Sequence, residues 1–133
     1  MASNSLPKLR RLAKSEQFRA VLSRRMVARD SLLAVFIAPN QLGFPRVGVV
    51  VRKSTGKAVV RNRIKRLFRE AFRLSQSDIP ADFDYIIMLS PKWLNMFAED
   101  LNAKEAAMRL KTEQVQTAFL RLAARIFSQR RDN

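Results

Sequence analysis

Three runs of apolar residues have the length and composition of buried strands. Residues 31–38 (Ser-Leu-Leu-Ala-Val-Phe-Ile-Ala) are continuously apolar after the serine, and a Pro-Asn turn signal follows them. The β-branched run 47–51 and the run 85–89 have the same character, and Pro80 and Pro91 bound the last one. The connection between the first two runs is short enough for an antiparallel pair. The pattern therefore predicts three strands, with the first two placed as possible antiparallel neighbours.

Helical spacing begins early in the chain. Residues 1–13 are polar and basic and are predicted to form a flexible arm. A short helix is predicted after this arm, with Ser15 as its cap and with Phe18, Val21 and Leu22 on one face.

The C-terminal region, residues 92–133, is predicted to be helical. Asn102 and Glu105 have the spacing of a capping box. A helical stripe follows, made of Val115, Ala118, Phe119, Leu122 and Ile126. The pattern leaves open whether residues 102–127 form one helix or two.

The most informative segment is a predicted helix over residues 57–75, which divides into two faces at about 100° per residue. The apolar face is predicted to join the core and contains Val60, Ile64, Leu67, Phe68, Ala71 and Leu74. The opposite face is cationic and contains Lys57, Arg61, Lys65, Arg69 and Arg73, with Asn62 and Arg66 at its flank. The order of elements predicts a single α+β domain over residues 1–133, with helices packed on a small sheet. A strand–helix–strand crossover in such a domain is ordinarily right-handed.

Charge then decides the class of partner. The chain carries 26 Lys and Arg against 11 Asp and Glu, a formal charge of +15. A polyanion is the partner that such a field favours, with nucleic acid first and an anionic membrane surface second. A merely solvated helix face would carry acidic residues among the basic ones, whereas the helix over 57–75 has only Glu70. Its arginines favour phosphate, and its apolar face is needed for the core, so nucleic acid is preferred over lipid.

The composition also excludes several kinds of chemistry. The chain has no Cys and no His, which excludes the usual zinc sites and nucleophilic dyads. The close acidic pairs, Asp82/Asp84 and Glu99/Asp100, lack a further partner, so no catalytic and no metal-binding residues are predicted. The N-terminus has no apolar core of a signal peptide, and no stretch approaches the roughly 20 apolar residues of a membrane span, so a cytoplasmic protein is expected.

One stretch is more specific than any of these patterns. Residues 48–70 read Gly-Val-Val-Val-Arg-Lys-Ser-Thr-Gly-Lys-Ala-Val-Val-Arg-Asn-Arg-Ile-Lys-Arg-Leu-Phe-Arg-Glu. This stretch, with Arg61-Asn62-Arg63 at its centre, resembles the signature of the bacterial ribonuclease P protein. Residues 12–21 match the opening helix of that family and residues 46–48 its second strand, and the resemblance extends over about residues 6–90.

The resemblance implies both a fold and a function. The implied fold is a two-layer α/β sandwich with a small mixed sheet, like a domain of some ribosomal proteins, with a left-handed βαβ crossover. The implied function is that of the protein subunit of ribonuclease P, which aids removal of the 5′ leader from precursor tRNA. The implied partners are ribonuclease P RNA, at one protein per RNA, and precursor tRNA, with no role for DNA or a membrane. Catalysis is expected in the RNA, and the ribonucleoprotein is expected to require Mg²⁺, with no cofactor bound by the protein alone.

The resemblance also implies two sets of site residues. Those facing the catalytic RNA are Lys57, Arg61, Asn62, Arg63, Lys65, Arg66, Arg69 and Arg73. Those of the cleft for the leader are Phe18, Phe36, Val50, Arg52 and Lys53. The chain departs from the family in having Arg52-Lys53-Ser54 in place of Ser-Lys-Lys, Leu22 in place of a second aromatic residue, and a longer segment 91–111.

The residues alone are compatible with further roles. Phe18 and Phe36 both lie in apolar stripes and fit a buried core as well as a stacking role. A ribosomal or RNA-chaperone protein could use the same basic face. A DNA-binding protein is less favoured, because Asn62 is the lone amide on the helix and no dimer seam is evident.

Overall fold

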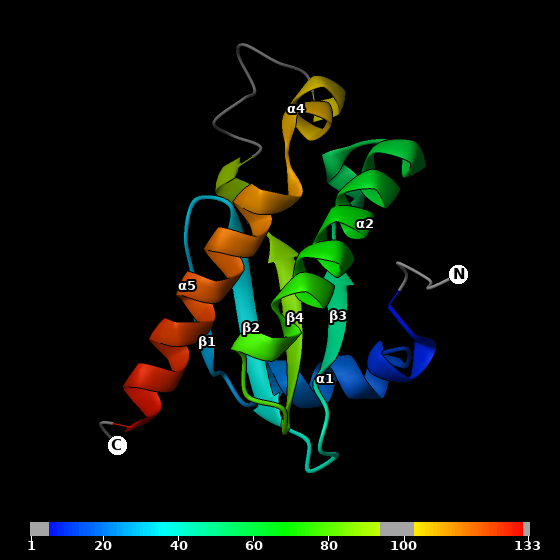
Figure 1. The fold of residues 1–133 in the computed structure, drawn as a ribbon. Helices are drawn as coiled ribbons and strands as arrows, with labels where there is room; N and C mark the ends of the chain where they lie inside the picture. Colours follow the sequence, from blue (N-terminus) through cyan, green and yellow to red (C-terminus); the bar gives the residue numbers. More distant parts are fainter. Residues whose placement is uncertain (1–5, 94–102, 132–133) are drawn as a thin grey trace.

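The computed structural model describes residues 6–93 and 103–131. Its centre is a four-stranded mixed sheet in the order β1-β2-β4-β3 (Figure 1). The strands are β1 (Val27–Arg29), β2 (Leu33–Pro39), β3 (Arg46–Val50) and β4 (Phe83–Leu89). The α-helices are α1 (Ser15–Ser23), α2 (Ala58–Ser75), α4 (Ala103–Arg109) and α5 (Thr112–Arg131). The 3₁₀ turns are η1 (Lys8–Arg10), η2 (Lys53–Thr55) and η3 (Gln76–Asp78). The predicted α+β class is thus confirmed.

The three predicted strands are present, but the first two are not neighbours. β4 lies between them and pairs antiparallel with β2 and parallel with β3. The physical reason lies in β4 itself, where Tyr85, Ile86 and Ile87 are all fully buried. A strand that is apolar on both faces belongs in the middle of a covered sheet. The short strand β1, which was not predicted, pairs antiparallel with β2 and forms the opposite edge.

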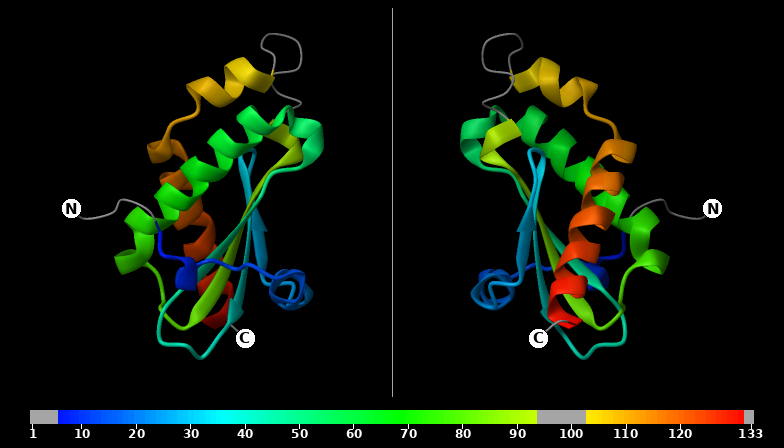
Figure 2. Two further views of the ribbon diagram at one scale, coloured as in Figure 1. Left: turned by 90° about the vertical axis from the view of Figure 1, so that its right-hand side faces the viewer. Right: turned by 90° about the vertical axis from the view of Figure 1, so that its left-hand side faces the viewer.

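Helices cover both faces of the sheet, so the fold has more than the two layers expected. α2 and α5 pack together on one face, and α1 lies on the other (Figure 2). Between α2, α5 and β4, the rings of Phe72, Tyr85 and Phe119 meet with centroids 5.7 to 6.0 Å apart. The Tyr85 hydroxyl donates to the Pro80 carbonyl at 2.7 Å, and burial raises the pKa of Tyr85. This aromatic cluster joins the three elements into one core.

The core-facing side of α2 differs from its predicted composition at two positions. Val60, Ile64, Phe68 and Ala71 are buried as expected, and Leu67 is half-buried. Leu74 is wrong as a core residue, because 45% of it is exposed, and Phe72 is fully buried instead. The reason is that α2 packs against α5 as well as against the sheet. The face of α2 that carries Phe72 is therefore buried, because the Phe72 ring contacts Phe119 of α5.

The expectation of a loose N-terminal arm is wrong for residues 6–12. Leu6 and Leu12 are buried, with 3% and 6% of their surfaces exposed. The Leu12 N–H donates to the Val47 carbonyl at 2.8 Å, and Arg11 forms a parallel bridge with Val47. The segment therefore pairs with the outer edge of β3. Leucines recur at every third position of this segment, a spacing that does not predict an extended chain paired with a strand edge.

The ends of the helices also differ in detail from the prediction. Lys14, not Ser15, caps α1, and the Gln17 side chain accepts hydrogen bonds from the Ala13 and Lys14 N–H groups at 2.7 and 3.0 Å. The C-terminal region contains two helices, α4 and α5. The predicted Asn102–Glu105 box lies partly outside the described residues. No helix in the described ranges is long and apolar enough to cross a membrane.

Asp30 connects the β1–β2 turn to α5 through hydrogen bonds and an ion pair. Its carboxylate accepts the N–H groups of Leu32 and Leu33 at 2.8 and 2.7 Å and pairs with Arg121 at 2.9 Å. Burial alone would raise the pKa of Asp30, but these hydrogen bonds and the Arg121 charge hold it below its ordinary 3.8.

We expect Asp30→Ala to lower the free energy of unfolding by about 1–2 kcal/mol at neutral pH, because two N–H groups lose their acceptor. A carboxylate with a depressed folded pKa stabilises above its unfolded pKa and loses that contribution as pH falls through the folded value. The difference between wild type and variant should therefore shrink below pH 3.8 in urea titrations. Asp78→Ala, at an exposed site, is the control. A difference that is constant with pH would contradict this role of the Asp30 charge.

Candidate nucleic-acid interface

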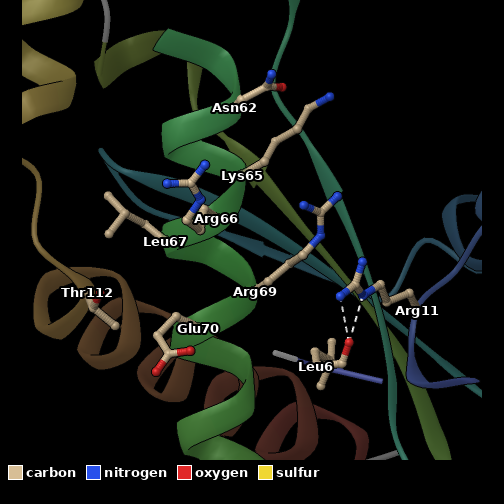
Figure 3. A pocket seen from close by; sticks show the side chains of 9 residues that line it. All are labelled: Leu6, Arg11, Asn62, Lys65, Arg66, Leu67, Arg69, Glu70 and Thr112. Carbon is tan, nitrogen blue, oxygen red and sulfur yellow. Dashed lines mark hydrogen bonds between the residues drawn. The ribbon is translucent and has the colours of Figure 1, made fainter. Parts of the chain in front are cut away.

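The cationic side of α2 faces an open groove of about 730 Å³. We call this the cationic groove, and its polar lining consists of Arg11, Asn62, Lys65, Arg66, Arg69, Glu70 and Thr112. Figure 3 shows Asn62, Lys65 and Arg69 in a row along α2, with Arg11 facing Arg69 from the N-terminal segment. The side chains come together because residues at i, i+3 and i+7 share one helix face.

Two arginines from distant parts of the chain meet in this groove. Arg11 is held in place by donating from Nε and Nη2 to the Leu6 carbonyl at 2.9 and 2.6 Å. Burial, and then the nearby charge of Arg11, lower the pKa of Arg69. No ion pair neutralises Arg11, Lys65 or Arg69 within the described parts of the chain. Such an unneutralised, partly buried group of cations favours an anion between them.

Several predicted RNA-facing residues of α2 have partners inside the protein. Arg73 pairs with Glu70 at 2.6 Å, which offsets part of its charge. Arg63 points toward α4 and donates to the carbonyls of Ala107 and Met108 at 3.1 and 3.3 Å. Arg61 donates to the Gly56 carbonyl at 3.0 Å. None of these three lines the groove, and neither does Lys57, which is exposed at the start of the helix.

The predicted leader residues gather on the other side of the sheet. Phe18, Phe36 and Val50 are half-buried, together with Leu22, and pack on a small buried cluster of Leu12, Val21, Ala38 and Ile86. We call the half-buried group the α1 face. Arg52 and Lys53 are exposed just beyond the end of β3. The sequence left open whether Phe18 and Phe36 are core residues or stacking residues. Both are half-buried, so each ring packs against the core and still has part of its surface accessible to a ligand.

Gly48 explains how Phe18 comes to lie against the sheet. A Cβ at residue 48 would stand 2.4 Å from Cε1 of Phe18, far inside contact distance. Gly48 pairs with Ile86, which in turn pairs with Phe36, so these residues form one row across the strands. Because Gly48 has no side chain, the Phe18 ring can occupy the space next to the strand at this position.

Neither Arg11 nor Gly48 was predicted as a site residue. A signal existed for Gly48, because a glycine inside a β-branched run indicates close approach of another group. No comparable signal marks Arg11, which stands among other basic residues.

The acidic pair Asp82/Asp84 has structural partners. Asp84 forms a bidentate pair with Arg46 at 2.9 and 2.7 Å and accepts a hydrogen bond from Asn40 Nδ2 at 2.8 Å. The hydrogen bond to Asp84 raises the pKa of Arg46. Asp82 accepts the Gly43 N–H at 2.8 Å. Within the described residues no three acidic, Cys or His side chains are close enough to hold a metal ion. Glu99 and Asp100 lie outside those residues.

The fold and this surface define a class: a small basic α+β domain whose mixed sheet carries a cationic helix groove on one side and an aromatic patch on the other. The family model described as Ribonuclease P matches residues 6–126. The chain belongs to the bacterial ribonuclease P protein component family, as its Arg-Asn-Arg motif indicated. Members of this family are components of the ribonucleoprotein endoribonuclease that matures the 5′ end of tRNA.

Individual relatives agree with this assignment. The ribonuclease P protein component of Alkaliphilus oremlandii is 39% identical over 80 residues, which are 60% of this chain and 70% of that one. The component from Methylococcus capsulatus is 46% identical over 83 residues, covering 62% and 64%. The match thus spans slightly less than two thirds of the latter's length. Among solved structures, the RNase P protein from Thermotoga maritima has 26% identity and a TM-score of 0.60, covering 80% of this chain and 96% of that one. The Staphylococcus aureus protein, at 24% identity and a TM-score of 0.64, shares the fold over 85% and 91%.

Proposed function

We propose that this chain binds ribonuclease P RNA through the cationic groove and the 5′ leader of precursor tRNA through the α1 face, and so aids leader removal. The observation that carries the proposal is the convergence of Arg11, Lys65 and Arg69, none of which forms an ion pair among the described residues, while Glu70 in the same groove is paired with Arg73. Arginine can grip a phosphate with two parallel hydrogen bonds, which suits a structured RNA backbone. Neutralising RNA phosphates in this way would also lower the Mg²⁺ concentration that the ribonucleoprotein needs for productive folding.

The α1 face has the chemistry that a single-stranded leader requires. Unpaired bases expose their ring faces, and aromatic side chains stack on them without regard to sequence. Phe18 and Phe36 supply such rings, and Val50 extends the apolar surface. Arg52 and Lys53, at the end of β3, supply charges for the adjoining phosphates. In this proposal the chemical step belongs to the RNA, and the protein contributes substrate affinity.

We also infer a left-handed β3–α2–β4 crossover. In Figure 1, with both strands pointing upward and α2 in front of the sheet, β4 lies to the left of β3, which supports this hand. The crossover sets α2 and the α1 face on opposite sides of one sheet. Catalytic RNA and leader could then bind at once without competing.

The test is leader-dependent cleavage of precursor tRNA by a bacterial ribonuclease P RNA at low Mg²⁺. We expect wild-type protein to stimulate cleavage more for a long leader than for a substrate without one. Phe18→Leu and Gly48→Ala should each reduce that leader-dependent gain by about fivefold or more, because each removes or displaces a stacking ring. Binding to ribonuclease P RNA alone should stay unchanged.

Phe44→Leu is the matched control, since the Phe44 ring is half-buried and packs under Arg10 rather than in the α1 face. Stimulation that is independent of the leader in the wild type would exclude the leader role. RNA binding without any stimulation would instead favour a structural RNA-binding role.

A further inference from the structure

A second group of arginines lies at the opposite edge of the molecule from β3. Figure 1 shows β1 and the C-terminal half of α5 side by side at this edge, while the N-terminal segment lies beyond β3. All members of the group are exposed, and we call them the edge arginines: Arg24, Arg25, Arg29, Arg121, Arg125 and Arg130. Among the described residues, one ion pair involves this group, between Arg121 and Asp30. The edge is therefore strongly cationic, and the binding sites described above do not use it.

The edge arginines surround a small hollow. This space of about 200 Å³ lies between Arg25 and Arg130 and is also lined by Met26, Val27, Ile126 and Gln129. Its lining thus combines three apolar side chains with two arginines and one amide. Arg125 Nη1 lies 3.4 Å from the Arg29 carbonyl, which brings the α5 arginines to β1. The apolar side chains beside the exposed guanidinium groups of Arg25 and Arg130 suit a nucleotide, with its base on the apolar part and its phosphate at the arginines. The Arg130 guanidinium also lies 5.2 Å from the centre of the Phe83 ring, which holds it at this edge.

The backbone at Arg25 adds an independent observation. This residue follows the end of α1 with φ of 56°, a left-handed conformation that costs a non-glycine residue free energy and that glycine adopts readily. The Arg25 side chain is exposed and forms no ion pair within the described residues. The Arg25 guanidinium is therefore available to an anion outside the fold.

The edge is also continuous with the α1 face. The Arg29 guanidinium lies 5.8 Å from the centre of the Phe36 ring, and β1 pairs directly with β2 through Val27 and Phe36. A strand of RNA stacked on Phe36 would thus pass Arg29 and reach Arg25 and Arg125 without leaving the protein surface.

We propose that the edge arginines bind the phosphates of the upstream part of the leader, where single-stranded RNA extends past the α1 face. This inference rests on the proposed leader role. It extends the RNA path over β1 to a surface formed by α5 and the end of α1.

Strand-edge protection, membrane binding and self-association each fit this edge less well than RNA does. Charged residues protect exposed strand edges from pairing, but this purpose does not require arginines on α5 or the cost at Arg25. A membrane surface would need exposed apolar side chains, and the large ones in the described residues (Leu9, Leu42, Val59, Leu74 and Met108) lie on other elements. A second copy of the chain would bring like charges together.

The test uses the full chain reconstituted with a bacterial ribonuclease P RNA. Its affinity for precursor tRNA is measured over a range of salt concentrations, with a short leader that ends within the α1 face and with a longer one. The variant is Arg25→Gln/Arg125→Gln/Arg130→Gln, which leaves Arg29 and Phe36 in place. Lys92→Gln/Arg109→Gln/Lys111→Gln is the control, because it removes the same charge from exposed positions elsewhere.

We expect the edge variant to bind the long-leader substrate about tenfold more weakly and to lower its salt dependence by about 0.7 per lost phosphate contact. Binding of the short-leader substrate should match wild type. An edge variant that behaves like the control would overturn this inference while leaving the leader role intact. Equal weakening for both substrates would also overturn it. If the wild-type complex binds both substrates with equal affinity and its cleavage shows no leader-dependent stimulation, the proposed function and this inference are both overturned.

Arg25→Gly separates binding from folding. Because glycine relieves the left-handed backbone, the urea midpoint of this variant should rise or stay constant, while long-leader affinity falls about threefold. Unchanged affinity would contradict a role for Arg25 in RNA binding.

Discussion

Lys65→Gln/Arg69→Gln is expected to weaken binding to ribonuclease P RNA by about tenfold or more and to lower its salt dependence by about 1.4 to 1.8. Both side chains line the cationic groove beside Arg11. In that groove Arg69 has a lowered pKa because it is partly buried and close to a like charge. An RNA phosphate would relieve this repulsion, so the loss of either cation removes a contact that the protein itself cannot replace.

The measurement is a titration of labelled RNA with protein across a salt series. Arg24→Gln/Lys92→Gln removes the same charge from exposed positions that do not line the groove and should change the slope little. Arg73→Gln should have an intermediate effect, because Glu70 already offsets the charge of Arg73. Arg61 is not chosen for this test, because its side chain donates to the Gly56 carbonyl near the start of α2 and its loss could change the fold as well as RNA binding. Equal slopes for the double variant and the control would contradict the role of the groove.

Phe72→Ala is expected to lower the free energy of unfolding by about 3–5 kcal/mol. Phe72 is fully buried, and its ring contacts those of Tyr85 and Phe119, so truncation leaves a cavity between α2, β4 and α5. Urea unfolding at neutral pH is the measurement.

Leu74→Ala provides the matched comparison on the same helix. Leu74 is 45% exposed, and its truncation should cost less than about 1 kcal/mol. Equal losses for the two variants would contradict the observed orientation of α2, which sets the direction of the cationic groove. The stability variants thus test the orientation of α2 on its buried side, and the RNA-binding variants test it on its exposed side.

The sequence by itself determined the family, the class of fold and most of the elements. The run of β-branched residues 47–51, the helical period of residues 57–75 and the Arg61-Asn62-Arg63 motif are local signals, because each depends on neighbours along the chain. Net charge is likewise a property of composition, and it indicated a polyanionic partner before any fold was known. These features can be predicted without knowing which helices and strands pack against one another.

Only the tertiary structure decided which side chains meet. The strand order depends on burial of β4 on both faces, and a local pattern that favoured β2 beside β3 could not show it. The approach of Arg11 to Arg69 joins residues that are far apart in sequence, and it depends on docking of residues 6–12 against β3. The helix period alone could not choose between Phe72 and Leu74, because the position of α5 fixes which arc of α2 is buried. Such contacts arise from packing between elements, and no periodicity along a single segment contains them.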